Sequence, residues 1–489
     1  MKETNAAGGA PVIRNFLWRL AERVGAQGVK LLVELVLARI LMPEEYGVIA
    51  LVTVFITIFN VFVDSGLGNA LIQKKDADEL DFSSVFWFNV CWCVVLYGVL
   101  FLISPLVARF YNREELTLIL RVLGLQVVIS GVKNVYQAWV SRNMQFRKFF
   151  FATLGGTLGA AVIGITMALR GWGVWALVAQ HLFNMLTDTV ILCFTVKWRP
   201  KRMFSFTRLK GLLSYGWKLL LSALLDTVYN EARQLIIGKV YTAEDLAFSN
   251  RGELFPQVVT VNVNASIDSV LLPVMSREQD ERTRVRAMTR RAIMTSTYLM
   301  APLMFGIACA GEPMIRLILT EKWLPCVPYL RVFCAAMLFF PIHTANLNAI
   351  KAMGRSDLFL KLEILKKAVG ITLILATMRI SVMAMALSTL VNSALCQVIN
   401  SWPNRKLLDY RYRDQLLDIL PNLLAAAVMG ACVLGLGFLP LPDWLLLPLQ
   451  IIAGIAVYTG ISVFTKNESY TYLLSMLKKF RKKGFTTDA

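Results

Sequence analysis

Apolar runs about as long as a membrane is thick recur along the whole sequence. Residues 85–107, 149–169 and 444–464 are three of them, each near the roughly 20 residues that a helix needs to cross a bilayer. Charged residues make up only 17% of the chain, against roughly 25% in an ordinary soluble domain. This pattern excludes a soluble globule, and we expect an all-α polytopic membrane protein.

Counting the apolar segments predicts about fourteen transmembrane helices joined by short connections, the longest of them around residues 275–290. The helices are expected at 16–41, 47–72, 84–109, 117–140, 149–169, 172–196, 212–240, 247–273, 291–318, 326–350, 359–377, 380–402, 417–439 and 444–465. The chain carries 51 Lys and Arg against 32 Asp and Glu, and most of the basic residues lie in every second connection. By the positive-inside rule these connections, and with them both termini, face the cytoplasm. Because topology explains the net charge of +19, we expect no nucleic-acid partner.

The sequence also repeats itself. Residues 38–47, ARILMPEEYG, align with residues 238–247, GKVYTAEDLA, so that basic residues meet basic residues and acidic residues meet acidic ones. In the same register Asp64 falls on Asn264, and further along Arg121 falls on Arg331. Each half holds six helices, so both halves start on the same side of the membrane, as parallel repeats.

The repeat predicts the domain organisation. We expect an N-terminal six-helix lobe over 1–196, a basic cytoplasmic linker over 197–211 and a second six-helix lobe over 212–402. Two more helices lie within 403–465, outside the duplication, and a basic cytoplasmic tail covers 466–489. Two parallel lobes can open a cavity between them to either side in turn, which is typical of a transporter.

Charged residues form a stripe on the first helix of each half. Inserting one charged side chain into the middle of a membrane helix costs roughly 2.5–3.5 kcal/mol of free energy. On the helix expected at 16–41 the stripe is Arg23, Lys30 and Glu34, and on the helix expected at 212–240 it is Lys218, Asp226, Asn230 and Arg233. We expect both stripes to line the cavity between the lobes. For Lys30 and Glu34 the alternative is a self-neutralising pair one turn apart.

Other helices carry single polar residues whose roles stay open. Asp64, Asn264 and Asp268 could bind a ligand or proton, or could cap and pack helices. His343 could carry a proton near neutral pH or bridge two helices by hydrogen bonds. Asp226 is the preferred candidate for coupling to a proton or cation, and a plain ion pair is the alternative. Lys133, Asn134, Asp188 and Asn348 are further polar residues within helices.

Signatures of catalysis are missing from the sequence. It has no Walker motif, no Gly-x-Ser-x-Gly, no His-Glu-x-x-His and no paired cysteine ligands. No connection is long enough to hold a folded catalytic domain. We therefore expect no enzyme, no cofactor and no metal site.

Four segments, in this order and spacing, carry a family resemblance: LARILMPEEYG at 37–47, DSGLG at 64–68, LLPVMS at 271–276 and EKW at 321–323. They resemble the polysaccharide transporter family of the multidrug/oligosaccharidyl-lipid/polysaccharide (MOP) flippase superfamily. Within that family the chain looks most like the colanic-acid type of repeat-unit flippase.

This resemblance implies the MOP flippase fold and a function in exopolysaccharide or lipopolysaccharide biosynthesis. The substrate would be an undecaprenyl-diphosphate-linked oligosaccharide, moved across the bacterial inner membrane by alternating access. Membrane lipid, a polysaccharide polymerase and a chain-length regulator would be the other partners. Two alternatives stay open: a small-molecule or drug antiporter of the same superfamily coupled to a cation, and a non-transporting scaffold of a polysaccharide assembly complex.

The resemblance also implies a cationic cavity, which assigns roles to the polar residues. The candidates for substrate binding are Arg23, Lys30, Lys218, Asn230, Arg233, Asn264 and His343. The candidates for coupling or charge pairing are Glu34, Asp64, Asp226 and Asp268.

Overall fold

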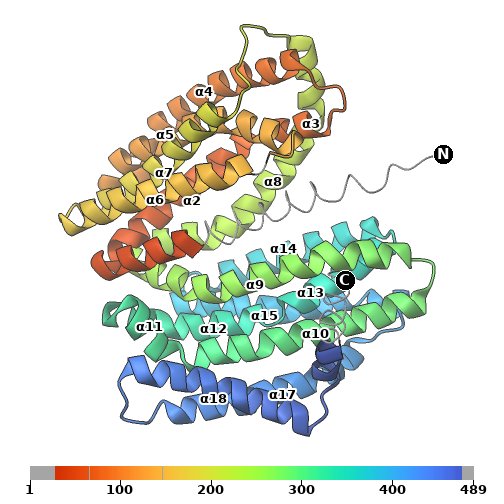
Figure 1. The fold of residues 1–489 in the computed structure, drawn as a ribbon. Helices are drawn as coiled ribbons and strands as arrows, with labels where there is room; N and C mark the ends of the chain where they lie inside the picture. Colours follow the sequence, from red (N-terminus) through yellow and green to blue (C-terminus); the bar gives the residue numbers. More distant parts are fainter. Residues whose placement is uncertain (1–27, 65, 146, 476–489) are drawn as a thin grey trace, which may run out of the picture. The chain divides into compact units, whose positions relative to one another are not determined.

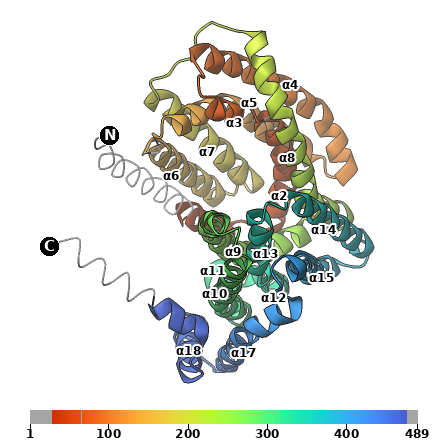
Figure 2. The same ribbon diagram turned by 90° about the vertical axis from the view of Figure 1, so that its right-hand side faces the viewer.

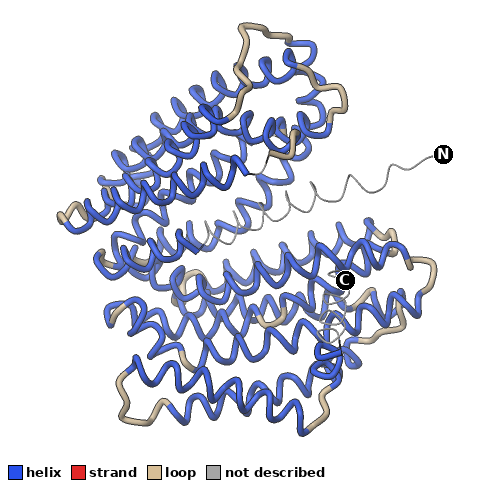
Figure 3. Tube along the Cα trace, viewed as in Figure 1, coloured by secondary structure: helices blue, strands red, loops and turns tan. Residues whose placement is uncertain are grey.

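The regular structure of the chain is helical. The computed structural model describes residues 28–64, 66–145 and 147–475, and every regular element in these ranges is a helix (Figure 3). Contacts divide the chain into two compact parts, residues 1–247 and 248–489, which we call unit 1 and unit 2. The all-α architecture expected from the apolar runs is therefore confirmed.

Unit 1 is built from long helices that pack side by side. After a helical stretch at 28–40, the elements are α2 (Pro43–Asp64), α3 (Leu67–Gln73), α4 (Glu79–Tyr111), α5 (Glu115–Arg142), α6 (Arg147–Leu169), α7 (Val174–Thr195), α8 (Phe206–Val240) and the start of α9 (Ala243–Arg277). The helix α4 packs against α5, and α6 packs against α7 (Figure 1). The helix α2 contacts α5, α7 and α8, so it is central to the unit.

An aromatic core joins the expected linker to unit 1. The ring of Trp198 lies 6.0 Å from Phe86 of α4 and 5.3 Å from Tyr136 of α5, between ring centroids. Leu209 and Leu212, at the start of α8, are buried in the same core. Contacts thus place α8 with unit 1, whereas the sequence repeat assigns it to the second lobe. The lobe boundaries remain a prediction from the repeat.

Unit 2 contains the remaining helices. They are the rest of α9, α10 (Arg282–Cys309), α11 (Gly311–Leu319), the 3₁₀ turn η1 (Glu321–Cys326), α12 (Val327–Met337), α13 (Phe340–Ala352), α14 (Ser356–Thr377), α15 (Val382–Ser401), α16 (Asn404–Leu407), α17 (Tyr412–Leu436) and α18 (Asp443–Phe464). The helix α10 contacts α12, α13 and α17, and α17 pairs with α18 (Figure 2).

Buried polar contacts attach α17 and α18 to α10. The hydroxyl of Tyr298 donates to Ser462 Oγ at 3.1 Å, and the hydroxyl of Tyr458 donates to the carbonyl of Tyr298 at 2.9 Å. Asn422 Nδ2 donates to the carbonyl of Met294 at 3.0 Å. The two helices outside the duplication are therefore a fixed part of unit 2.

Eleven helical segments in the described ranges are long and apolar enough to cross a membrane. The expected helix at 16–41 is described only from residue 28. The other two expected spans, α8 and α14, are helices of 35 and 22 residues, and neither contains an 18-residue stretch that is apolar enough and limited to two charged residues. The chain is a multi-span membrane protein, and these three segments account for the difference from the expected fourteen.

Several expected helices are interrupted or extended. The segment expected at 47–72 divides into α2 and α3 near Gly66, whose φ of 70° is left-handed and suits a residue without a Cβ. The segment expected at 326–350 divides into α12 and α13. The connection expected around 275–290 is nearly all helix, because α9 continues to Arg277 and α10 begins at Arg282.

Candidate functional site: polar couples inside the helical units

An acid and an amide meet in unit 1 where α2 ends. Asn134 Nδ2, on α5, donates to Asp64 Oδ1 at 3.0 Å and to the carbonyl of Val63 at 3.4 Å. The amide of Asn134 also lies against Gly68, where an added Cβ would come within 2.7 Å of Asn134 Oδ1. The interruption between α2 and α3 therefore leaves the carbonyl of Val63 free to accept a hydrogen bond from Asn134. Gly68 has no side chain, which makes room for the amide of Asn134.

Unit 2 contains a couple of the same kind. Asn348 Nδ2, on α13, donates to Asp268 Oδ1, on α9, at 2.7 Å. One turn before each acid stands an asparagine, Asn60 on α2 and Asn264 on α9. The Oδ1 atom of each of these two asparagines is buried and has no hydrogen-bond partner within the described part of the chain.

These contacts give one acid in each unit the same kind of partner, although the predicted repeat register does not align the two acids. The alignment placed Asp64 on Asn264, but Asp64 and Asp268 are the two acids that bond an asparagine from the helix packed beside them. Asn60 is then the counterpart of Asn264, one turn further back on each helix. We call Asn60, Asp64 and Asn134 the unit 1 couple, and Asn264, Asp268 and Asn348 the unit 2 couple.

A buried ion pair lies beside the unit 1 couple. Lys133 Nζ, on α5, is 2.5 Å from Asp188 Oδ2, on α7, and the two side chains are only 16% and 7% exposed. Lys133 Nζ also contacts Met185 Sδ at 3.7 Å. In unit 2 the residue before the couple's asparagine is Leu347, so the lysine has no counterpart there.

His343, expected either to carry a proton or to bridge helices, contacts α15 through both ring nitrogens. Its Nε2 lies 3.5 Å from Ser393 Oγ, and its Nδ1 lies 3.3 Å from Asn400 Nδ2. One turn away, Asn346 exchanges hydrogen bonds with Gln415 of α17 at 2.9 and 3.1 Å. These contacts make α13 the helix through which α15 and α17 are joined by polar groups.

The charged stripes are described only in part. Lys30 Nζ lies 3.7 Å from Glu34 Oε1, so the pair considered as the alternative to cavity lining forms on the helical stretch 28–40, with the lysine side chain 63% exposed. On α8, Asp226 and Asn230 are exposed and Arg233 is half-buried. Arg23 and the side chain of Lys218 lie outside the described part. Both roles considered for these stripes remain predictions.

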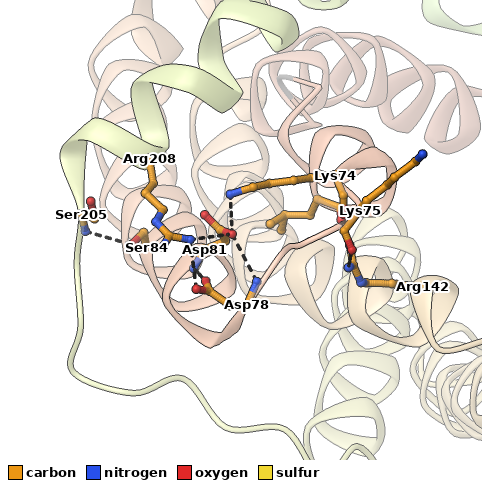
Figure 4. Close-up of polar contacts among 9 residues, drawn as sticks. Lys74, Lys75, Asp78, Asp81, Ser84, Arg142, Ser205 and Arg208 are labelled. Atoms are coloured by element: carbon orange, nitrogen blue, oxygen red, sulfur yellow. Dashed lines mark hydrogen bonds and ion pairs between the residues drawn. The ribbon is translucent and has the colours of Figure 1, made fainter.

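A clasp of charged residues closes the end of unit 1 that carries the expected linker (Figure 4). Asp78 and Asp81 form a capping box at the start of α4, and Arg208 of α8 binds both acids, at 2.9 and 3.4 Å. Lys74 Nζ lies 2.6 Å from Asp81 Oδ2. The backbone N–H of Asp81 and then the charge of Arg208 hold the pKa of Asp78 below its usual value.

Further hydrogen bonds near these charged residues hold the end of α3 and the segment before α8. Arg142 donates to the carbonyls of Leu71 and Lys75, at 2.8 and 2.7 Å, just where α3 ends. The N–H of Ser205 donates to Ser84 Oγ at 2.9 Å. The expected linker is therefore held against α4 of unit 1 by hydrogen bonds.

The sequence did not identify the residues that partner the acids as site residues. Asn134, Asn348 and the pair Lys133 and Asp188 were noted as polar residues within helices but were not selected as site residues. The available signal was the Asn-x-x-x-Asp spacing, which occurs at the corresponding position of both halves. No group of three or more His, Cys, Asp and Glu side chains able to hold a metal ion occurs in the described ranges.

The chain matches a protein family and several curated relatives. A family model described as polysaccharide biosynthesis protein matches residues 36–328. The chain is 25% identical to the succinoglycan biosynthesis transport protein ExoT of Rhizobium meliloti, over 65% of each chain, so the match spans just under two thirds of that relative. It is 25% identical to the teichuronic acid biosynthesis protein TuaB of Bacillus subtilis, over 78% of this chain and 79% of that one. It is 22% identical to the lipopolysaccharide biosynthesis protein WzxC of Escherichia coli, over 86% and 87%.

Solved structures show the same fold. The lipid II flippase MurJ, in an inward closed conformation, matches with a TM-score of 0.75 and 13% identity, over 92% of this chain and 99% of that one. An inward-facing multidrug resistance MATE family transporter of the MOP superfamily matches with a TM-score of 0.62 and 13% identity, over 78% and 94%. The fold expected from the family resemblance is therefore confirmed.

Proposed function

Because the chain belongs to the family described as polysaccharide biosynthesis protein, we propose that it is a flippase for lipid-linked oligosaccharide repeat units. It moves an undecaprenyl-diphosphate-linked oligosaccharide across the bacterial inner membrane by alternating access. The observation that carries the proposal is the family match over residues 36–328 of a chain with the MurJ fold. The names of ExoT, TuaB and WzxC support the substrate class, since each refers to the biosynthesis of a polysaccharide.

The polar and charged residues within the helices bind different parts of the substrate. Arg23, Lys30, Lys218 and Arg233 attract the diphosphate, and Asn230, Asn264 and His343 contribute polar groups to the substrate site. Glu34 neutralises Lys30 until the substrate arrives, since the two lie 3.7 Å apart. Asp226 balances the cations or couples transport to an ion. The substrate leaves chemically unchanged, so no catalytic residue or cofactor is needed.

A drug antiporter is the second candidate, because the MATE transporter shares the fold. The match to MurJ covers 92% of this chain and the match to the MATE transporter covers 78%, which favours the flippase. A scaffold without transport would need no charges within its helices, where they are costly. A polymerase and a chain-length regulator are the further partners that we propose for the flipped product.

The proposed function predicts transport by the purified protein. In proteoliposomes that contain fluorescent lipid-linked repeat units, the inner-leaflet label is shielded from a bilayer-impermeant quencher, and it should be lost faster with the protein than without it. Arg233→Ala should slow this loss on the order of tenfold, because a charge-assisted contact to the diphosphate is lost. Lys210→Ala, an exposed change on the same helix, is the matched control. No transport of repeat units, together with export of cationic dyes, would favour the antiporter.

The proposed orientation predicts where reporter fusions fall. Fusions at Ser205, Glu281 and Arg405 should report cytoplasm, and fusions at Asn112 and Lys322 should report periplasm, because the basic connections stay inside. Paired phosphatase and fluorescent-protein fusions measure both outcomes. A reversed result at two of the five positions would contradict the orientation.

A further inference from the structure

The two couples present the same chemistry in both units. In each, one oxygen of the acid accepts a hydrogen bond from an asparagine, and within the described residues neither Asp64 nor Asp268 forms an ion pair. Both acids are exposed although they lie in segments apolar enough to span a membrane. An ionisable group in such a segment needs a partner or water, so each couple has room for a ligand.

The ligand must supply hydrogen-bond donors. The second carboxylate oxygen of each acid accepts no bond from the described residues, and the buried Oδ1 atoms of Asn60 and Asn264 have no partner there. Oxygens of this kind bind N–H or O–H groups or a positive charge. A diphosphate brings neither, and a carboxylate would repel it.

The partner amides occupy one oxygen of each acid and leave the other for a ligand. Asn134 and Asn348 donate through Nδ2 to the carboxylates. This orientation follows from the hydrogen bonds that each amide makes. A sugar hydroxyl both donates and accepts, so neighbouring hydroxyls on one ring can bond a carboxylate oxygen and an amide together.

We propose that the unit 1 and unit 2 couples bind the hydroxyl groups of the substrate's sugars. This inference rests on the proposed function and deepens it, because it separates the two ends of one substrate. Cations bind the diphosphate, and the acid and amide couples bind the oligosaccharide. Sites that hydrogen-bond a hydroxyl discriminate strongly against substrates without it, so the couples would select for glycan structure.

The inference is tested by binding two lipids to the purified full-length protein. One is the repeat-unit lipid extracted from the native host, and the other is undecaprenyl diphosphate without sugar. Asp268→Leu should weaken binding of the glycosylated lipid on the order of tenfold, and Asp268→Asn should weaken it less, because an amide still bonds hydroxyls. Binding of the sugar-free lipid should not change in either variant.

Matched variants keep the result interpretable. Asn262 lies on the same helix, and within the described residues its side-chain amide bonds only the carbonyl of Val258, so Asn262→Leu should bind both lipids as the wild type does. Asp64→Leu and Asp64→Asn should repeat the pattern in unit 1. Elution as a monodisperse peak shows that a variant is folded. If a variant of Asp268 is not folded, Asn348→Ala replaces it, and if a variant of Asp64 is not folded, Asn134→Ala replaces it.

Three outcomes would overturn the inference. The first is equal binding of the two lipids by the wild type, and the second is unchanged binding by both leucine variants. The third is equal loss in the asparagine and leucine variants together with a requirement for sodium ions or protons, which would make the couples cation sites. Preferential binding of the glycosylated lipid without transport in proteoliposomes would instead support the inference and contradict the flippase function.

Discussion

Lys133→Met is expected to destabilise the protein severely and to abolish transport. The change leaves Asp188, 7% exposed, without the ammonium group that lies 2.5 Å from it. Removing one partner of a buried ion pair costs roughly 3–5 kcal/mol, because the remaining charge stays in a medium that cannot solvate it. Methionine keeps most of the length of the lysine side chain, so the effect reports the charge. Heating aliquots and measuring the soluble monodisperse fraction would show the loss of stability.

A double variant separates the charge from its surroundings. Lys133→Met combined with Asp188→Leu removes both charges, and we expect it to recover most of the lost stability, as apolar replacements of buried ion pairs often do. If transport also returns, the pair only joins α5 to α7. If stability returns without transport, Lys133 or Asp188 takes part in transport itself. A single variant as stable as the wild type would contradict the buried pair.

The sequence predicts which segments are membrane helices better than it predicts where those helices end. Run length and charge predict which segments are membrane helices, because a bilayer sets one length for all of them. The same reasoning cannot predict the interruption near Gly66, since it depends on Asn134 of another helix satisfying the freed backbone. Nor does it predict that Trp198 packs the linker onto α4 and α5, a contact that only tertiary structure creates.

The site follows from the sequence only within single helices. The four-residue spacing of Lys30 and Glu34 offered an ion pair as the alternative to cavity lining, and the two side chains lie 3.7 Å apart. Lys133 and Asp188 stand on different helices, whose approach no local spacing encodes. For the same reason the repeat alignment, which places Asp64 on Asn264, does not show that Asp64 and Asp268 make the same kind of contact. Charge-lined helices suggest where a substrate binds, but contacts between helices identify the partners.

Gly47→Ala is expected to prevent normal packing of α2 within unit 1. A Cβ at Gly47 would lie 1.8 Å from the carbonyl oxygen of Ala243 and 2.4 Å from its carbonyl carbon. Both atoms belong to the backbone, so no side-chain rotation relieves the clash and the two segments must separate. Overpacking in a close-packed core costs typically 1–3 kcal/mol and occasionally more, and here it acts on the helix that contacts α5, α7 and α8. Folded yield and thermal stability in detergent would measure the effect.

Two other glycines supply the controls. At Gly238 an added Cβ would lie 2.0 Å from Leu51 Cδ2, the end of a flexible side chain, so Gly238→Ala should destabilise less than Gly47→Ala. At Gly98, inside α4, it would meet nothing within 4 Å, so Gly98→Ala should be neutral or slightly stabilising, because alanine is the better helix former. The expected order of stability is thus Gly98→Ala, then Gly238→Ala, then Gly47→Ala. Equal stability of all three would mean that α2 does not approach Ala243 this closely, since helix propensity alone would favour alanine at every one of them.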